Sequence, residues 1–187
     1  MAFTFNITLT GVSNPPVWRK IIVPEDFTFY RLHQIIQAVF GWKNRHMFQF
    51  SPGNFGSNPV ITMAGDGVEG PFLDCKTTKL ATIFTEPQQR FAYIYDFGDD
   101  WFHSITLEEI TDQQLTQADC IDGRGACPPE DCGGTGGYHE LKRIMKFAGR
   151  PEHDEMREWL KLPVGQGWNA NYFDLDKTRA RIQKVAP

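Results

Sequence analysis

The first fifty residues predict two strands followed by a helix. Residues 3–12, FTFNITLTGV, place apolar side chains at alternate positions, as a half-buried strand does. The NPP run at 14–16 interrupts the alternation, and VWRKIIV at 17–23 resumes it as a partner strand. From Thr28 the apolar spacing changes to three and four residues, which predicts a helix that starts at Thr28 as N-cap and stops at Gly41.

The strongest hairpin pattern in the chain covers residues 90–110, where two alternating runs flank a Gly-Asp-Asp turn. A strand is also expected at 46–51, an irregular excursion at 52–75 and a short element at 80–84.

Helical spacing dominates the last fifty residues. It predicts helices at 138–149, at 151–162 and from an Asp174 cap to Val185, with Met156, Trp159 and Leu160 facing inward. Because strands mostly come first and helices last, we predict an α+β fold in a single domain, 1–187. An antiparallel sheet with a long central hairpin is covered by about four helices on one side, and the C-terminal part is mostly helical.

The end of the hairpin carries candidate chemistry. A loop with an even number of residues places Phe97 opposite Phe102 and Asp96 opposite His103. Phe91, Tyr93 and Tyr95 then share a face with Phe102, and Ile105 and Leu107 share the other face with His103. A carboxylate that orients an imidazole suits metal binding or proton transfer, and it also suits a purely structural hydrogen bond. An odd loop would remove the pairing.

Composition narrows the class of protein. At 187 residues, with 41% hydrophobic and 13% aromatic side chains, the chain can build a real core. No apolar run approaches the roughly 20 residues that a membrane helix needs, and the N-terminus lacks the pattern of a signal peptide. We therefore expect a cytoplasmic protein without a membrane partner, in which the four cysteines stay reduced.

The net charge of -4 is unevenly distributed. Residues 51–135 hold four basic and fourteen acidic side chains, whereas both flanking segments are basic. An acidic middle disfavours binding to a long polyanion. It favours cation binding or a solvated surface.

The segment 120–146, CIDGRGACPPEDCGGTGGYHELKRIMK, allows several interpretations. Its cysteines follow a C-x6-C-x4-C spacing, and Cys120, Cys127 and Cys132 with His139 are a candidate zinc site. Buried or merely reduced thiols are the alternative, and a redox pair is disfavoured because there is no C-x-x-C.

The glycines of this segment precede a helix, where backbone N–H groups attract anions, but the phosphate-binding P-loop pattern is missing. A conformational role is favoured, in which Gly134, Gly136 and Gly137 permit positive φ or close backbone approach. Together with Pro128 and Pro129 they predict a stiff connector that packs on the hairpin, with Tyr138 as its apolar anchor.

Several motifs resemble one known family. They are PPVWRKIIVP at 15–24, LHQIIQAVFGW at 32–42 followed by His46 and Phe50, YIYDFGDDWFHSITLE at 93–108, CIDGRGACPPEDCGG at 120–134 with GY at 137–138, and HDEMREWL at 153–160. In this order they resemble the plasmid pRiA4b ORF-3-like family, also described as insertion-element passenger TnpR-like proteins, over about residues 4–180.

The resemblance implies an origin on plasmids or mobile elements and implies no established activity. A resolvase, which the TnpR label suggests, is not supported, because the first sixty residues offer only Arg19, Arg31 and Arg45 beside their serines and the chain is acidic. The family's loop does not always carry all three cysteines, which favours Asp, Glu, His and Gly as the working residues.

Three functions remain in view. The absence of a complete catalytic constellation favours a binding or interaction module over an enzyme, with a protein partner expected and no established cofactor. The surface proposed for it comprises Asp96, Asp99, Asp100, an exposed Trp101, His103, Glu130, Asp131 and Tyr138. The alternatives are a divalent-metal-dependent hydrolase or nuclease that uses Asp96 and His103, and nucleic-acid binding through Lys177, Arg179, Arg181 and Lys184.

Overall fold

An eight-stranded sheet organises the chain, and the computed structural model describes residues 1–65 and 70–185. The strands are β1 (Ala2–Leu9), β2 (Trp18–Pro24), β3 (Phe48–Ser51), β4 (Ile61–Thr62), β5 (Leu73–Asp74), β6 (Arg90–Tyr95), β7 (Trp101–Thr111) and β8 (Asp119–Arg124). The helices are α1 (Phe29–Phe40), the 3-10 turn η1 (Leu80–Thr82), α2 (Gly134–Ile144), α3 (Pro151–Trp159) and α4 (Leu175–Ile182).

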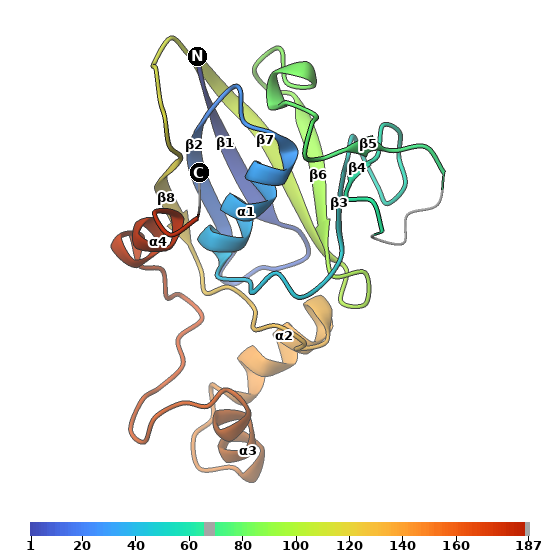
Figure 1. The fold of residues 1–187 in the computed structure, drawn as a ribbon. Coiled ribbons are helices and arrows are strands. Elements are labelled where there is room, and N and C mark those ends of the chain that lie inside the picture. Colours follow the sequence, from blue (N-terminus) through green and yellow to red (C-terminus); the bar gives the residue numbers. More distant parts are fainter. Residues whose placement is uncertain (66–69, 186–187) are drawn as a thin grey trace.

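The sheet order is β5-β4-β3-β6-β7-β1-β2-β8, and every neighbouring pair is antiparallel except β4 with β5. The predicted α+β class and the central position of the hairpin are therefore confirmed. Figure 1 shows α1 lying in front of the sheet with α4 beside it, while α2 and α3 lie beyond the lower end of the strands. None of the helices in the described part of the chain has the length and apolar character needed to cross a membrane.

The core lies between the sheet and α1. Alternate residues of β1, such as Phe5 and Ile7, are fully buried, while Asn6 and Thr8 on the other face are only partly buried. This is the alternation that the sequence predicted. Rings from several elements meet edge to face in the core, as Phe29 and Phe50 do at 5.1 Å between centroids.

The predicted caps of α1 and α4 are confirmed. The Thr28 hydroxyl accepts a hydrogen bond from Arg31 N at 3.2 Å, and Gly41 ends α1 with a φ of 87°. Asp174 Oδ1 accepts from Lys177 N at 2.9 Å and caps α4, which ends at Ile182 rather than at the predicted Val185.

The register of the central hairpin differs from the predicted one. Tyr95 lies opposite Trp101 and Tyr93 lies opposite His103, so residues 96–100 form a loop with an odd number of residues. The predicted pairing of Asp96 with His103 is wrong for this reason. The odd loop turns the side chains of Trp101 and His103 to the same face as Tyr93 and Tyr95, and that face is the core.

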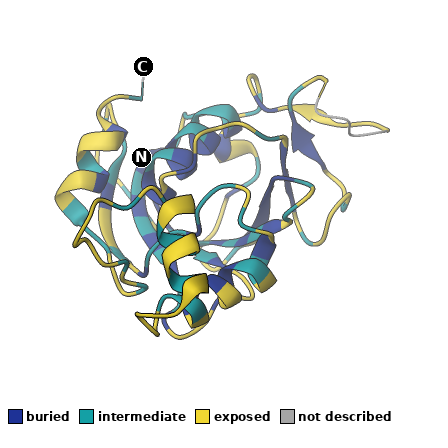
Figure 2. Cartoon of the chain, turned by 90° about the horizontal axis from the view of Figure 1, so that it is seen from below, coloured by how far each residue is buried: buried dark blue, intermediate teal, exposed yellow. Residues whose placement is uncertain are grey.

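The C-terminal helices lie further from the core than predicted. Seen from their end of the molecule, the strands are mainly buried and the helices nearest the viewer carry mostly exposed residues (Figure 2). Met156 and Leu160 pack partly against the core, but Trp159 is 47% exposed, so its predicted inward orientation is wrong. The reason is that α3 packs mainly on α2 rather than on the sheet.

Helix α2 starts four residues earlier than predicted, so the glycine run lies inside its first turns. Gly134 has a φ of 63°, and a Cβ there would lie 2.6 Å from the carbonyl oxygen of Asp99. A Cβ at Gly137 would overlap the carbonyl oxygen of Cys132, whereas one at Gly136 would meet nothing within 4 Å. Positive φ or close approach is thus found at Gly134 and Gly137 but not at Gly136.

Two neighbouring substitutions test this packing. We expect Gly137→Ala to lower the free energy of unfolding by about 1–3 kcal/mol, because the new methyl group must push the Cys132 carbonyl away. Gly136→Ala, the matched control, should raise it by about 0.5–1 kcal/mol, because alanine is the better helix former. Urea unfolding of both variants and the parent measures the difference, and equal values for the two variants would contradict the close approach.

Candidate functional site

Three segments that are distant in the sequence meet at the loop end of the hairpin. His46 follows α1, Asp96 follows β6, and Glu130 and Asp131 lie in the proline-rich connector. The imidazole Nε2 of His46 is 3.5 Å from Asp96 Oδ2, 3.3 Å from Glu130 Oε2 and 3.2 Å from Asp131 Oδ1. We call these four residues the carboxylate–imidazole cluster.

The Nε2 atom of His46 sits between the three oxygens rather than aiming at one of them. It is inaccessible to solvent and has no hydrogen bond of acceptable geometry in the described structure, although the ion-pair distances are short. The short distances and the missing hydrogen bond are both explained if the nitrogen points into the space between the three oxygens rather than at one of them. A cation that binds there would contact one imidazole nitrogen and up to three carboxylate oxygens.

The loop after β6 fixes the Asp96 carboxylate. Its Oδ1 accepts hydrogen bonds from Gly98 N at 3.0 Å and from Asp99 N at 3.3 Å, which leaves Oδ2 for the cluster. Asp96 takes a φ of 61°, a conformation that aspartate tolerates better than most residues. Because the loop is odd, Asp96 is not paired in the hairpin, and its carboxylate faces His46.

Glu130 ties the connector to the other two segments. Its Oε1 accepts from Lys43 N and, at 3.1 Å, from the hydroxyl of Tyr95. Burial, with the negative charge of Glu130 adding to it, raises the pKa of Tyr95 well above its ordinary value, so the hydroxyl stays a donor. Asp131 has a φ of 59° and a side chain that is 61% exposed, so it forms the open side of the cluster.

The cluster offers the kinds of ligand atom that bind a metal cation. Among the described residues, His46, Asp96 and Asp131 are the one set of three His, Cys, Asp or Glu side chains whose ligand atoms lie within 4.8 Å of one another. Imidazole nitrogen and carboxylate oxygen are ligands for divalent metals such as Zn²⁺ and Mn²⁺. Glu130 adds a further carboxylate beside them.

The structure assembles part of the surface that the sequence predicts. Asp96, Glu130 and Asp131 meet in the cluster, and Asp99 lies beside them with its Oδ2 accepting from Gly133 N at 3.2 Å. Asp100 is exposed but lines a separate apolar hollow, which also includes Phe97 and Phe102.

The aromatic and imidazole members of the predicted surface lie in the core. Trp101, His103 and Tyr138 are fully buried, so the expectation of an exposed Trp101 is wrong. His103 Nδ1 lies 2.8 Å from the backbone carbonyl oxygen of Trp101, and His103 belongs to no group of metal-ligating side chains among the described residues. Tyr138 does anchor the connector as predicted, because its hydroxyl donates to the carbonyl of Ala126 at 2.7 Å.

The candidate zinc ligands do not converge. All four cysteines are free, and no three of Cys120, Cys127, Cys132 and His139 bring ligand atoms together in the described structure. His139 Nε2 instead lies 3.0 Å from the carbonyl oxygen of Gly11. Burial raises the pKa of the Cys120 thiol to about 11 and that of Cys132 to about 12, so both are protonated at neutral pH.

Sequence reasoning missed His46 as a site residue. Fifty residues separate it from Asp96, and it lies in a loop with no periodic pattern of its own. Its only signal was its place in the motif shared with the family.

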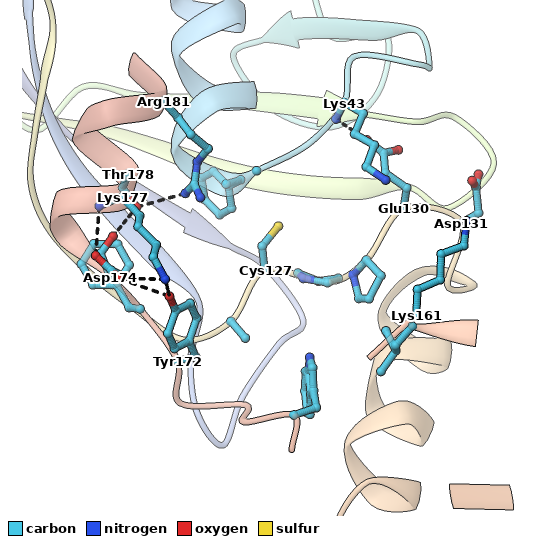
Figure 3. A pocket seen from close by; sticks show the side chains of 18 of the residues that line it. Lys43, Cys127, Glu130, Asp131, Lys161, Tyr172, Asp174, Lys177, Thr178 and Arg181 are labelled. Atoms are coloured by element: carbon cyan, nitrogen blue, oxygen red, sulfur yellow. Dashed lines mark hydrogen bonds and ion pairs between the residues drawn. The ribbon is translucent and has the colours of Figure 1, made fainter. Parts of the chain in front are cut away.

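A cleft opens beside the cluster. It has a volume of about 620 Å³ and lies between the end of α1, the connector, α4 and the segment from Trp159 to Asp174. Glu130 and Asp131 line this cleft (Figure 3). They also belong to the cluster, so the two features share a wall.

Comparison with known proteins gives consistent matches. Residues 1–177 match the family model of the plasmid pRiA4b ORF-3-like protein. The uncharacterised protein y4hQ of Sinorhizobium fredii is 33% identical over 172 residues, which cover 91% of this chain and 87% of that protein. The crystal structure of MM3350 from Methanosarcina mazei Go1, a protein of unknown function, matches with a TM-score of 0.78 and 31% identity over 94% of this chain and 96% of that one.

The buried histidines give a prediction for the pH dependence of stability. Burial lowers the pKa of His33 and of His103 to about 4, below the ordinary value of 6.5. Between these values the unfolded chain binds more protons than the folded one, so stability falls as pH falls from 6.5 towards 4. Each histidine lowers the free energy of unfolding by up to about 1.4 kcal/mol for each pH unit in this range.

Urea unfolding at pH 7, 6 and 5 measures this slope. Native-state NMR titration should show the His103 ring neutral throughout this range. A His103 ring that titrates near pH 6.5 would contradict the assignment.

Proposed function

The chain belongs to the plasmid pRiA4b ORF-3-like family, and we propose that it is a binding protein that holds one divalent cation in its carboxylate–imidazole cluster. The observation that carries the proposal is the convergence of oxygens from Asp96, Glu130 and Asp131 on one solvent-inaccessible nitrogen of His46.

The charge of the cluster supports this function. Three carboxylates can carry three negative charges, and the imidazole can offset only one of them. In the described part of the chain, no lysine or arginine side chain forms an ion pair with Asp96, Glu130 or Asp131. Like charges that are brought together in a partly buried site repel strongly, and a divalent cation would remove this cost.

The chemistry of the donors favours particular ions. Carboxylates suit hard cations and imidazole suits Zn²⁺ and its neighbours in the first transition row, so the mixed set fits Mn²⁺ or Zn²⁺ best. The free cysteines fit a reducing compartment, and we propose a cytoplasmic location for this reason. The family's plasmid origin supports an association with mobile DNA.

Metal-dependent hydrolysis is the second candidate. One observation favours it, because Glu130 and Asp131 belong to both the cluster and the cleft. A cation held there would face a ligand in the cleft and would lower the pKa of a bound water.

Nucleic-acid binding through α4 has less support. Arg179 donates to Asp119 and to the Cys120 carbonyl, and Arg181 donates to the carbonyl of Ala38. Two of the four basic residues on this segment thus serve the packing of the chain.

Calorimetric titration of Mn²⁺ and Zn²⁺ into the chelator-treated full chain tests the proposal. We expect about one cation per chain and a loss of affinity of at least about tenfold in Asp96→Asn. Asparagine tolerates the positive φ and keeps an oxygen for Gly98 N and Asp99 N, so the variant removes the charge and preserves the loop.

The matched control is Asp100→Asn. Asp100 belongs to the same loop, has a φ of 52° and lies outside the cluster, so its variant should bind as the parent does. No binding of either ion by the parent would overturn the proposal. Equal zinc binding by both variants would also overturn it, because the ion would then lie elsewhere.

A further inference from the structure

The cleft beside the cluster has the size of a small-molecule site. Its volume of about 620 Å³ falls in the range of ligand pockets, roughly 300–1,000 Å³. In Figure 3 Lys177 and Arg181 lie on the α4 side, Lys43 and Lys161 lie on the opposite side, and Cys127 lies between them. The walls therefore come from four separate parts of the chain.

The lining of the cleft is positive in a chain that is negative overall. It comprises six basic residues, Arg19, Lys43, Arg45, Lys161, Lys177 and Arg181, and three acidic ones, Glu130, Asp131 and Asp174. The whole chain has a net charge of -4, so the cleft is a local exception. Such a concave positive site attracts small anions.

The basic residues divide into two groups. Arg19 donates to the carbonyls of Trp18, Val39, Arg124 and Gly125, Arg181 donates to the end of α1, and Lys177 bonds to Tyr172 and Asp174. Lys43, Arg45 and Lys161 are exposed, and their side chains have no hydrogen bond or ion pair to any described residue. These three charges remain available for a ligand with more than one negative charge.

The cleft also exposes aromatic rings. Trp159 is 47% exposed and Tyr172 is 50% exposed, and both line the cleft. Aromatic side chains that line a concave site are typical of small-molecule pockets. A planar ring stacked on one of them would cover this surface, and stacking on an aromatic side chain contributes about 1–3 kcal/mol for a nucleic-acid base.

From these two properties we infer that the cleft binds a phosphorylated, ring-bearing small molecule of the class of a nucleoside monophosphate. The phosphate lies among Lys43, Arg45 and Lys161, and the ring contacts Trp159, because the Tyr172 ring is already covered by Lys177. A long polyanion is disfavoured, because residues 51–135 hold fourteen acidic side chains against four basic ones. The inference goes beyond the cation site, since none of the three basic residues belongs to the cluster.

Binding measurements on the full chain test this inference first in the presence of chelator, so that the result does not depend on a cation, and then with Mn²⁺. AMP, GMP, CMP and UMP are titrated, and the nucleotide that binds most tightly is compared with its nucleoside and with ribose 5-phosphate. We expect each part to bind at least about tenfold more weakly than the whole nucleotide, because each keeps only one of the two contacts.

Two pairs of variants locate the contacts. Lys43→Gln should weaken the nucleotide and ribose 5-phosphate and spare the nucleoside, whereas Lys184→Gln, the same change outside the cleft, should alter nothing. Trp159→Leu should weaken the nucleotide and the nucleoside and spare ribose 5-phosphate. Its control is Phe147→Leu, since Phe147 is also 50% exposed and lies away from the cleft.

Absence of measurable binding for all the nucleotides, with chelator and with Mn²⁺ alike, would overturn the inference. An equal loss in Lys43→Gln and Lys184→Gln would overturn it too, because it would show unspecific attraction by charge. Either result leaves the cation titration standing, and failure of the cation titration leaves this one standing, so the two proposals fail separately.

Discussion

The odd number of residues in the loop 96–100 is the constraint on which the site depends. Strand side chains alternate between faces, so one residue more or fewer in the loop would move every side chain of β7 to the other face of the sheet. With the observed register, Trp101 and His103 join the core beside Tyr93 and Tyr95. The same loop holds Asp96 outside the ladder, where its carboxylate meets His46.

Two arginines, the buried Arg19 and the exposed Arg181, hold the walls of the cleft together. Arg19 is 3% exposed and donates to carbonyls of α1, β2 and the end of β8, so one guanidinium joins three elements. Burial lowers its pKa, but an arginine stays charged in a protein and needs these acceptors. Arg181 adds a second link between α4 and the end of α1. Lys43, Arg45 and Lys161 take no part in these links, so their charges face the cleft without a partner among the described residues.

Local patterns in the sequence account for most of the elements, and contacts over long distances account for most of the site. The ends of α1 follow from Thr28 and Gly41, because a cap acts within one turn of its helix. Alternation of apolar and polar residues predicts the hairpin. It does not predict whether the loop has an odd or an even number of residues, because a run of Gly and Asp residues allows either. The start of α2 within a run of glycines depends on close contacts with Asp99 and Cys132, which no local propensity reveals. His46 and the exposed Trp159 depend in the same way on which segments the fold brings together.

The shared wall of the cluster and the cleft has a consequence for binding energetics. Glu130 and Asp131 would weaken the binding of an anion in the cleft when the cluster is vacant, and a cation held between them would offset their charge. A cation and a phosphorylated ligand would then raise each other's affinity by the same factor, because coupling between two binding equilibria is reciprocal. Asp96 contributes to this coupling only through the cation, since it lines the cluster and not the cleft. With two carboxylates shared by the proposed cation site and the positive cleft, the occupancy of one site would control the affinity of the other.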